Sequence, residues 1–157
     1  MMEKLNVRRM VEGKLSRPEL QEVISAPKDP GRYHMTNAVW QELLDWDDKI
    51  VMRLGEHLFI VRRDSQHFVR CDCGEEFGDY RSNWKRHSRV YLRDSDEAME
   101  EIYPRLMHAD PSWMVLREFY CPNCLSLLEV EAVPPGYPVL HDFVPDLEGL
   151  AEWVGGT

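Results

Sequence analysis

Four cysteines in two close pairs are the residues of this chain whose types and spacing could do chemistry. Cys71 and Cys73 are separated by one residue, and Cys121 and Cys124 are separated by two. Thiolates are preferred ligands of Zn²⁺, and two such pairs brought together by folding make a tetrahedral site. Four protein ligands leave no open position for water or substrate, so we expect a metal ion that holds structure and does not catalyse a reaction.

The residues around each pair indicate how the sulfurs can face one ion. Residues two apart on a strand point to the same side, so Cys71 and Cys73 can act together if a strand over 67–70 runs into a turn at Gly74. The proline and asparagine between the second pair favour a turn of the zinc-knuckle kind. The pairs are 47 residues apart, against roughly 15–20 in a compact zinc ribbon, so the segment between them contains an insert.

Disulfides, free buried thiols and a redox-active pair are the alternative interpretations. A bridge between Cys71 and Cys73 would be strained, and the chain starts without the apolar stretch of a secretory signal. We therefore expect a reducing cytoplasm, in which paired cysteines act as metal ligands. A redox role for 121–124 would need a thioredoxin-like strand and helix, which the sequence does not indicate. His67 and His87 are reserve ligands, although an ordinary half-exposed histidine explains each of them.

Composition limits the class of protein. A length of 157 residues fits one domain or a small domain with arms, and 43 % hydrophobic residues are enough for a core. No apolar run approaches the roughly 18 residues of a transmembrane helix, so we expect no membrane association. A net charge of −9 argues against a general nucleic-acid binder, which usually carries a basic face.

One basic and aromatic cluster departs from this acidic average. Its cations are Arg81, Lys85, Arg86, Arg89 and Arg93, near Tyr80, Trp84 and Tyr91. Arginines can hold phosphates and aromatic rings can stack on bases, so a free-standing zinc-ribbon regulator that binds nucleic acid through Arg81–Arg93 is one alternative. We favour a basic surface that faces an acidic partner or the chain's own acidic C-terminal part.

The elements predict an α+β fold with a small antiparallel β core, a zinc-ribbon-like four-cysteine site, N-terminal helices and an extended C-terminal arm. Residues 1–49 are predicted to be a helical docking segment, with a capping box at 16–19 and a second helix from about Thr36. Residues 50–132 are predicted to be the β-rich zinc-binding domain, with a helical insert around 94–104 and strands over 50–54, 58–63, 67–70, 113–120 and 125–132.

Residues 133–157 contain prolines that exclude a long regular element, yet they are too apolar for a disordered tail. We expect an extended arm that lies along another protein surface. Its pair His141 and Asp142 could do acid–base chemistry, and a small zinc enzyme that uses this pair and an open metal site is a further alternative. Neighbouring side chains rarely point at each other, so structural use is favoured. Asp45, Asp47 and Asp48 could suggest a cation site, but capping a helix end explains them better.

Eight short segments resemble the gamma (small) subunit family of acetone carboxylase, and through it the equivalent subunit of acetophenone carboxylase. They cover residues 46–50, 58–61, 69–74, 83–85, 99–107, 111–113, 121–124 and 141–143. The segment 99–107 is specific, because no general zinc ribbon requires it. One departure from the ribbon pattern is Leu125, where glycine usually follows the second cysteine pair.

This resemblance implies a zinc-binding accessory subunit of an ATP-dependent, biotin-independent ligase that joins acetone and bicarbonate into acetoacetate. The implied partners are large alpha and beta subunits in a heterohexamer with two copies of each chain. ATP and Mn²⁺ would be bound by the large subunits only, so no catalytic or cofactor-binding residue is expected here. The chain also lacks the common nucleotide-binding and hydrolase motifs. The same role in acetophenone carboxylase is the alternative within the family.

Overall fold

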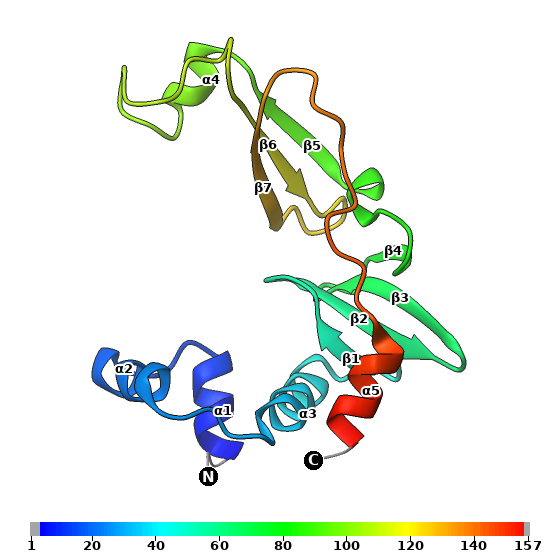
Figure 1. Ribbon diagram of the computed structural model, residues 1–157. Helices are drawn as coiled ribbons and strands as arrows, with labels where there is room; N and C mark the ends of the chain where they lie inside the picture. Colours follow the sequence, from blue (N-terminus) through cyan, green and yellow to red (C-terminus); the bar gives the residue numbers. More distant parts are fainter. Residues whose placement is uncertain (1–3, 156–157) are drawn as a thin grey trace. The chain divides into compact units, whose positions relative to one another are not determined.

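The computed structural model describes residues 4–155, with side chains up to Glu152. The ends of the two predicted flanking segments, 1–3 and 156–157, lie outside the described residues. The chain forms two compact units. One contains the residues up to Met52 together with those from Pro145 onward, and the other is Arg53–Val144 (Figure 1).

The first unit is helical. Its helices are α1 (Lys4–Val11), α2 (Arg17–Ser25), α3 (Arg32–Leu44) and α5 (Leu147–Gly155), and β1 (Lys49–Arg53) begins in it. The predicted capping box is confirmed, since the Ser16 backbone N–H and hydroxyl both donate to Glu19 Oε2 at 2.7 Å. α1 packs on α3, with Val7 and Val39 fully buried.

The bounds of α3 and the structure of the C-terminal segment differ from what the sequence predicts. α3 begins four residues before Thr36 and ends at Leu44, and the capping residue Asp45 has a left-handed backbone (φ 49°). The extended run of the predicted arm stops at Asp146, whose carboxylate accepts the Gly149 backbone N–H at 3.0 Å where α5 starts. The preceding prolines hid this short helix, because they break the periodicity that indicates one. No helix among the described residues is long and apolar enough to cross a membrane.

The second unit contains antiparallel strands, as the sequence predicts, and the structure divides them into two sheets. β2 (Leu58–Arg63), β3 (Gln66–Cys71) and β4 (Glu76–Asp79) lie side by side in that order. β5 (Arg89–Arg93), β6 (Val115–Tyr120) and β7 (Leu127–Val133) form the other sheet, with β6 central (Figure 1). The short helices η1 (Trp84–His87) and α4 (Asp96–Glu100) lie before and after β5.

A row of aromatic rings joins the two sheets inside this unit. Phe77 of β4 lies edge-on to Trp84 of η1 with ring centroids 6.0 Å apart, and Trp84 lies edge-on to Phe119 of β6 at 6.1 Å. Phe77 and Phe119 are fully buried, as are Phe59 and Val61 of β2. The core therefore runs from one sheet to the other, and it fixes where the ends of β3 and β6 lie.

Candidate metal centre

The two cysteine pairs lie where strands of the two sheets end. Cys71 is the last residue of β3, and Cys121 directly follows β6. Each pair sits in a tight turn. Gly74 N–H donates to the Cys71 carbonyl at 2.8 Å, and Leu125 N–H donates to the Cys121 carbonyl at 3.1 Å. Each strand also has a bulge close to its cysteine, between Val69 and Arg70 in β3 and between Phe119 and Tyr120 in β6. Bulges of this kind turn a strand end and re-aim its side chains.

The four sulfurs converge. Cys71 Sγ lies 3.8 Å from Cys124 Sγ, Cys73 Sγ lies 3.6 Å from Cys121 Sγ, and all four lie within 4.8 Å of one another. A Zn–S bond of about 2.3 Å gives a tetrahedron with edges of about 3.8 Å, so the donor set fits Zn²⁺. Disulfides need a sulfur separation of about 2.05 Å, and all four cysteines are free. The structure thus brings together the four cysteines that the sequence singled out.

Burial and hydrogen bonding divide the sulfurs into two kinds. Cys71 and Cys121 are fully buried, and burial raises the pKa of both thiols. For Cys124, burial opposes ionisation, but hydrogen bonding to Ser126 outweighs it and lowers the pKa to about 6. Cys124 Sγ lies 3.2 Å from Ser126 Oγ. A bound metal ion would hold buried thiols this close together as thiolates, because its binding would displace their protons.

Hydrogen bonds around the cluster hold its turns. His57 Nδ1 lies 2.6 Å from Asp72 Oδ2, and Asp72 N–H donates to the His57 carbonyl at 2.9 Å. Asn123 Nδ2 donates to Cys73 Sγ at 3.5 Å. Sequence reasoning missed His57. The signal that could have found it is the strand register, since Leu58 pairs with Cys71 and so places the preceding residue opposite Asp72.

The reserve ligands and the aspartate cluster do not join this site. His67 lies edge-on to Tyr80 at 5.8 Å, and His87 ends η1. The groups of potential metal ligands found between residues 4 and 152 include neither histidine, and they do not include the aspartates at 45, 47 and 48. Leu125 adopts φ 62°, the left-handed conformation that glycine would favour there. The departure from the ribbon pattern therefore leaves the turn intact, at the cost of backbone strain.

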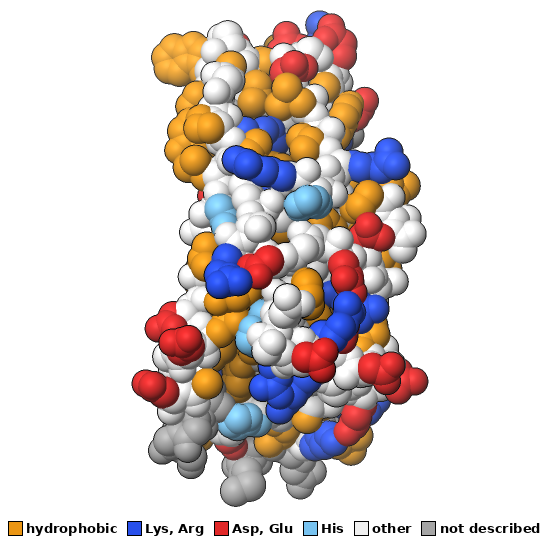
Figure 2. All heavy atoms as spheres, turned by 90° about the vertical axis from the view of Figure 1, so that its right-hand side faces the viewer, with side chains coloured by type: hydrophobic (Ala, Val, Ile, Leu, Met, Phe, Trp, Pro, Cys, Tyr) orange, Lys and Arg blue, Asp and Glu red, His pale blue; other side chains and the backbone are white. Residues whose placement is uncertain are grey.

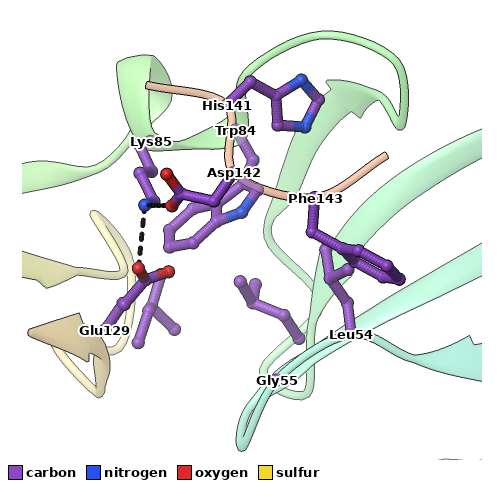
Figure 3. A pocket seen from close by; sticks show the side chains of 10 residues that line it. Leu54, Gly55, Trp84, Lys85, Glu129, His141, Asp142 and Phe143 are labelled. Carbon is purple, nitrogen blue, oxygen red and sulfur yellow. Dashed lines mark hydrogen bonds and ion pairs between the residues drawn. The ribbon is translucent and has the colours of Figure 1, made fainter. Parts of the chain in front are cut away.

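A second group of potential metal ligands consists of three carboxylates, and a lysine ammonium lies at its centre. Lys85 Nζ lies 2.8 Å from Glu129 and also pairs with Asp142 (Figure 3). It lies 2.5 Å from Glu131 as well, and the lysine side chain is only 2 % exposed. Burial disfavours the ammonium, but the three carboxylates outweigh burial and raise the pKa of Lys85. The ammonium lies among the carboxylate oxygens, so the cluster is an internal ion-pair network.

This network pins the segment that follows β7. Arg117 pairs with Glu131 at 2.5 Å and also donates to the Tyr137 carbonyl at 2.6 Å. Asp142 is used by Lys85, and Figure 3 shows the His141 ring pointing away from the Asp142 carboxylate. Both residues line a small cavity of about 140 Å³. The geometry therefore does not bring His141 and Asp142 together as an acid–base pair.

Three of the five cations in the basic cluster of the sequence pair with carboxylates of the same chain. Arg81 pairs with Asp79 at 2.9 Å, Lys85 with its three carboxylates, and Arg93 with Glu118 at 2.7 Å and Glu101 at 2.6 Å. On the face that Figure 2 displays, lysine and arginine side chains are interspersed with acidic and hydrophobic ones. A phosphate-binding surface would need cations that are not already committed to carboxylates.

Comparison of the sequence with known proteins identifies its family. The family model described as acetone carboxylase gamma subunit matches residues 44–154. The acetone carboxylase gamma subunit of Xanthobacter autotrophicus is 49 % identical over 149 residues, which cover 93 % of this chain and 89 % of that protein. The acetophenone carboxylase beta subunit of Aromatoleum aromaticum is 30 % identical over 101 residues, which cover 63 % of this chain and 78 % of that protein. The resemblance seen in the sequence is confirmed, and the chain belongs to the acetone carboxylase gamma subunit family.

Proposed function

We propose that this chain is the zinc-binding accessory subunit of a heteromeric ketone carboxylase that joins acetone and bicarbonate into acetoacetate. The observation that carries the proposal is the convergence of the four cysteine sulfurs in a member of this family. In this proposal Cys71, Cys73, Cys121 and Cys124 hold one Zn²⁺. The ion has a structural role, because four thiolates leave no position for water or substrate.

Zinc would fasten one sheet of the second unit to the other. Cys71 and Cys73 belong to the end of β3, and Cys121 and Cys124 lie between β6 and β7. The aromatic row at Trp84 joins the same two sheets through the core. Metal and core together would make this unit a rigid body, which suits a subunit that holds larger partners in a fixed relative position.

The chemistry itself is assigned to the large subunits. We propose that alpha and beta chains bind ATP and Mn²⁺, that two copies of each of the three chains form a heterohexamer, and that the complex works in the cytoplasm without biotin. Support comes from the chain's lack of a nucleotide-binding motif. The helical segment 1–49 and the arm 133–157 are proposed as docking elements that flank the zinc-binding domain 50–132.

Reconstitution from purified subunits tests the proposal. The large subunits, purified from the source cells, are mixed with zinc-loaded chain, and native mass spectrometry measures the assembly while a carboxylation assay measures acetoacetate. We expect a complex with one zinc per copy of this chain, and no ATP hydrolysis by the chain alone. Failure of the chain to bind the large subunits, or ketone carboxylation by the chain alone, would contradict the proposal.

The ketone is tested in the same assay. The 49 % identity to the acetone carboxylase subunit, against 30 % for the acetophenone carboxylase subunit, favours acetone. Acetoacetate formation with acetone, and no turnover with acetophenone, is the expected result. Turnover with acetophenone and not with acetone would instead identify the chain as a subunit of acetophenone carboxylase.

A further inference from the structure

The segment between α4 and β6 carries several strongly exposed apolar side chains. In Figure 1 it forms a long loop that projects from the sheet of β5, β6 and β7. Its exposed apolar residues are Ile102 (48 %), Tyr103 (42 %), Leu106 (85 %), Met107 (72 %) and Trp113 (80 %). Taken at roughly 150–250 Å² for each large side chain, these fractions sum to an exposed apolar area on the order of 600 Å². This sum over five side chains is comparable to the area of the largest apolar patches on ordinary monomers.

Contacts with buried residues hold the backbone of this loop, so its exposed apolar side chains have defined positions. Met99 beneath it is 1 % exposed, and the His108 side chain is 6 % exposed. Arg93 of β5 donates to the Ala98 carbonyl at 2.7 Å and pairs with Glu101 at 2.6 Å. These contacts attach the start of the loop to β5, while its apolar side chains are exposed to solvent.

Leu106 is the most exposed of these apolar residues. Its φ is 62°, a left-handed conformation that costs a branched residue about 1–2 kcal/mol. The conformation belongs to a turn that the Met107 N–H closes on the Pro104 carbonyl at 3.0 Å, and this turn holds the Leu106 side chain in solvent, 85 % exposed.

Charge indicates what kind of partner fits. Residues 94–114 contain one cation, Arg105, and six acidic residues, of which Glu101 is already paired with Arg93: Asp94, Asp96, Glu97, Glu100, Glu101 and Asp110. Two copies of this loop facing each other would bring like charges together, which disfavours a homodimer through this surface. A groove with apolar walls and a rim of lysine and arginine would complement it. An area on the order of 600 Å² is also close to the roughly 800 Å² that each side of a stable interface buries.

We infer that the α4–β6 loop is a docking surface that places Leu106, Met107 and Trp113 in an apolar, basic-rimmed groove of a large carboxylase subunit. The inference rests on the proposed function and goes beyond it by naming the surface and the chemistry of its partner. The three side chains act as the buried anchors of the contact, and the acidic residues around them set its orientation.

The chain provides a matched control for testing this surface. Leu125 also has φ 62° and is 61 % exposed, in the same compact unit, but it lies beside the cysteine cluster. Leu106→Asn and Leu125→Asn are therefore the same chemical change at the same backbone conformation, and asparagine tolerates that conformation. Trp113→Ser is the second variant of the patch. Zinc content and melting temperature are measured on each variant to show that it is folded.

The affinity of each variant for purified large subunits is measured by biolayer interferometry at low and high salt. We expect Leu106→Asn and Trp113→Ser to weaken binding roughly thirty-fold each, because central anchors carry most of an interface's energy. Leu125→Asn should stay within about two-fold of the unchanged chain, and salt should weaken binding of that chain.

Three results would overturn the inference. Folded Leu106→Asn and Trp113→Ser chains that bind as tightly as the unchanged chain would place the interface elsewhere. A concentration-dependent homodimer that Leu106→Asn abolishes would make the occupant a second copy. Lack of any binding by the unchanged chain would refute the proposed function itself, and this result is seen before any variant is compared.

Discussion

The guanidinium of Arg93 binds the carboxylate of Glu118 through two nitrogens, at 2.7 and 3.2 Å, and both side chains are buried. The two residues lie on neighbouring strands, β5 and β6. Tyr120 adds a third bond, since its hydroxyl donates to Glu118 Oε2 at 2.7 Å. The sequence showed only a basic cluster at 89–93, and the structure places the arginine that ends this strand beside a counter-ion inside the sheet.

Stability should depend on pH through Glu118. Burial favours its neutral form, but the bonds from Arg93 and Tyr120 outweigh burial and lower its pKa. A carboxylate with a lowered folded-state pKa stabilises the fold above its unfolded pKa, about 4.3, and this contribution is lost as pH falls through the folded value. Glu118→Gln should cost about 2 kcal/mol of unfolding free energy near pH 7, and the difference from the unchanged chain should shrink below about pH 4.5.

Urea denaturation of both chains between pH 3.5 and 7, with excess Zn²⁺, measures this difference. Glu76→Gln is the control, because it is the same chemical change at an exposed residue whose ion pair with Arg63 should contribute little. A pH-independent gap between the unchanged chain and Glu118→Gln would show that the carboxylate's charge does not carry the effect.

Removing one cysteine should release the metal ion. Cys121→Ser leaves three thiolates, and because metal binding and folding are coupled, we expect loss of zinc and a fall in melting temperature of roughly 10 °C or more. Elemental analysis and thermal unfolding measure both. His67→Ala is the matched control, since His67 contacts Tyr80 and lies outside the cluster, and it should keep one zinc. A Cys121→Ser chain with full zinc and an unchanged melting temperature would rule out the four-cysteine site.

Neutralising Lys85 should destabilise the second unit strongly. Lys85→Met leaves Glu129, Glu131 and Asp142 close together without the ammonium between them. We expect a loss of about 3–5 kcal/mol in unfolding free energy, typical of breaking a buried ion-pair network from one side. Asp142→Asn should cost less, because that side chain is 52 % exposed. Chemical denaturation measures the unfolding free energy of both variants. Equal losses in the two variants would contradict the prediction that the lysine contributes more to stability than Asp142 does.

Replacing Leu125 should make the chain more stable. Its left-handed backbone is strained for a leucine, whereas asparagine adopts it readily. Because the side chain is 61 % exposed, little packing is lost. We expect Leu125→Asn to raise the unfolding free energy by about 0.5–1 kcal/mol, with zinc content unchanged. A lower melting temperature would mean that the leucine makes a contact worth more than the strain.

Local sequence determined much of this protein. The spacing of Cys71, Cys73, Cys121 and Cys124 predicted the cluster that the structure brings together, because sulfur chemistry depends on residue type and turns depend on a few neighbours. The capping box at Ser16 and the runs of β2, β3, β6 and β7 were predicted for the same reason. The quoted segments were also enough to identify the family.

Only the tertiary structure decided which distant groups meet. Nothing local to Lys85 shows that carboxylates 44 to 57 residues away will surround it, and nothing local to Leu106 shows that it will stay in solvent. The same holds for His57 beside Asp72, which depends on the pairing of β2 with β3. Pairing and exposure arise from how strands and loops pack through space, and a pattern of neighbouring residues does not encode that packing by itself.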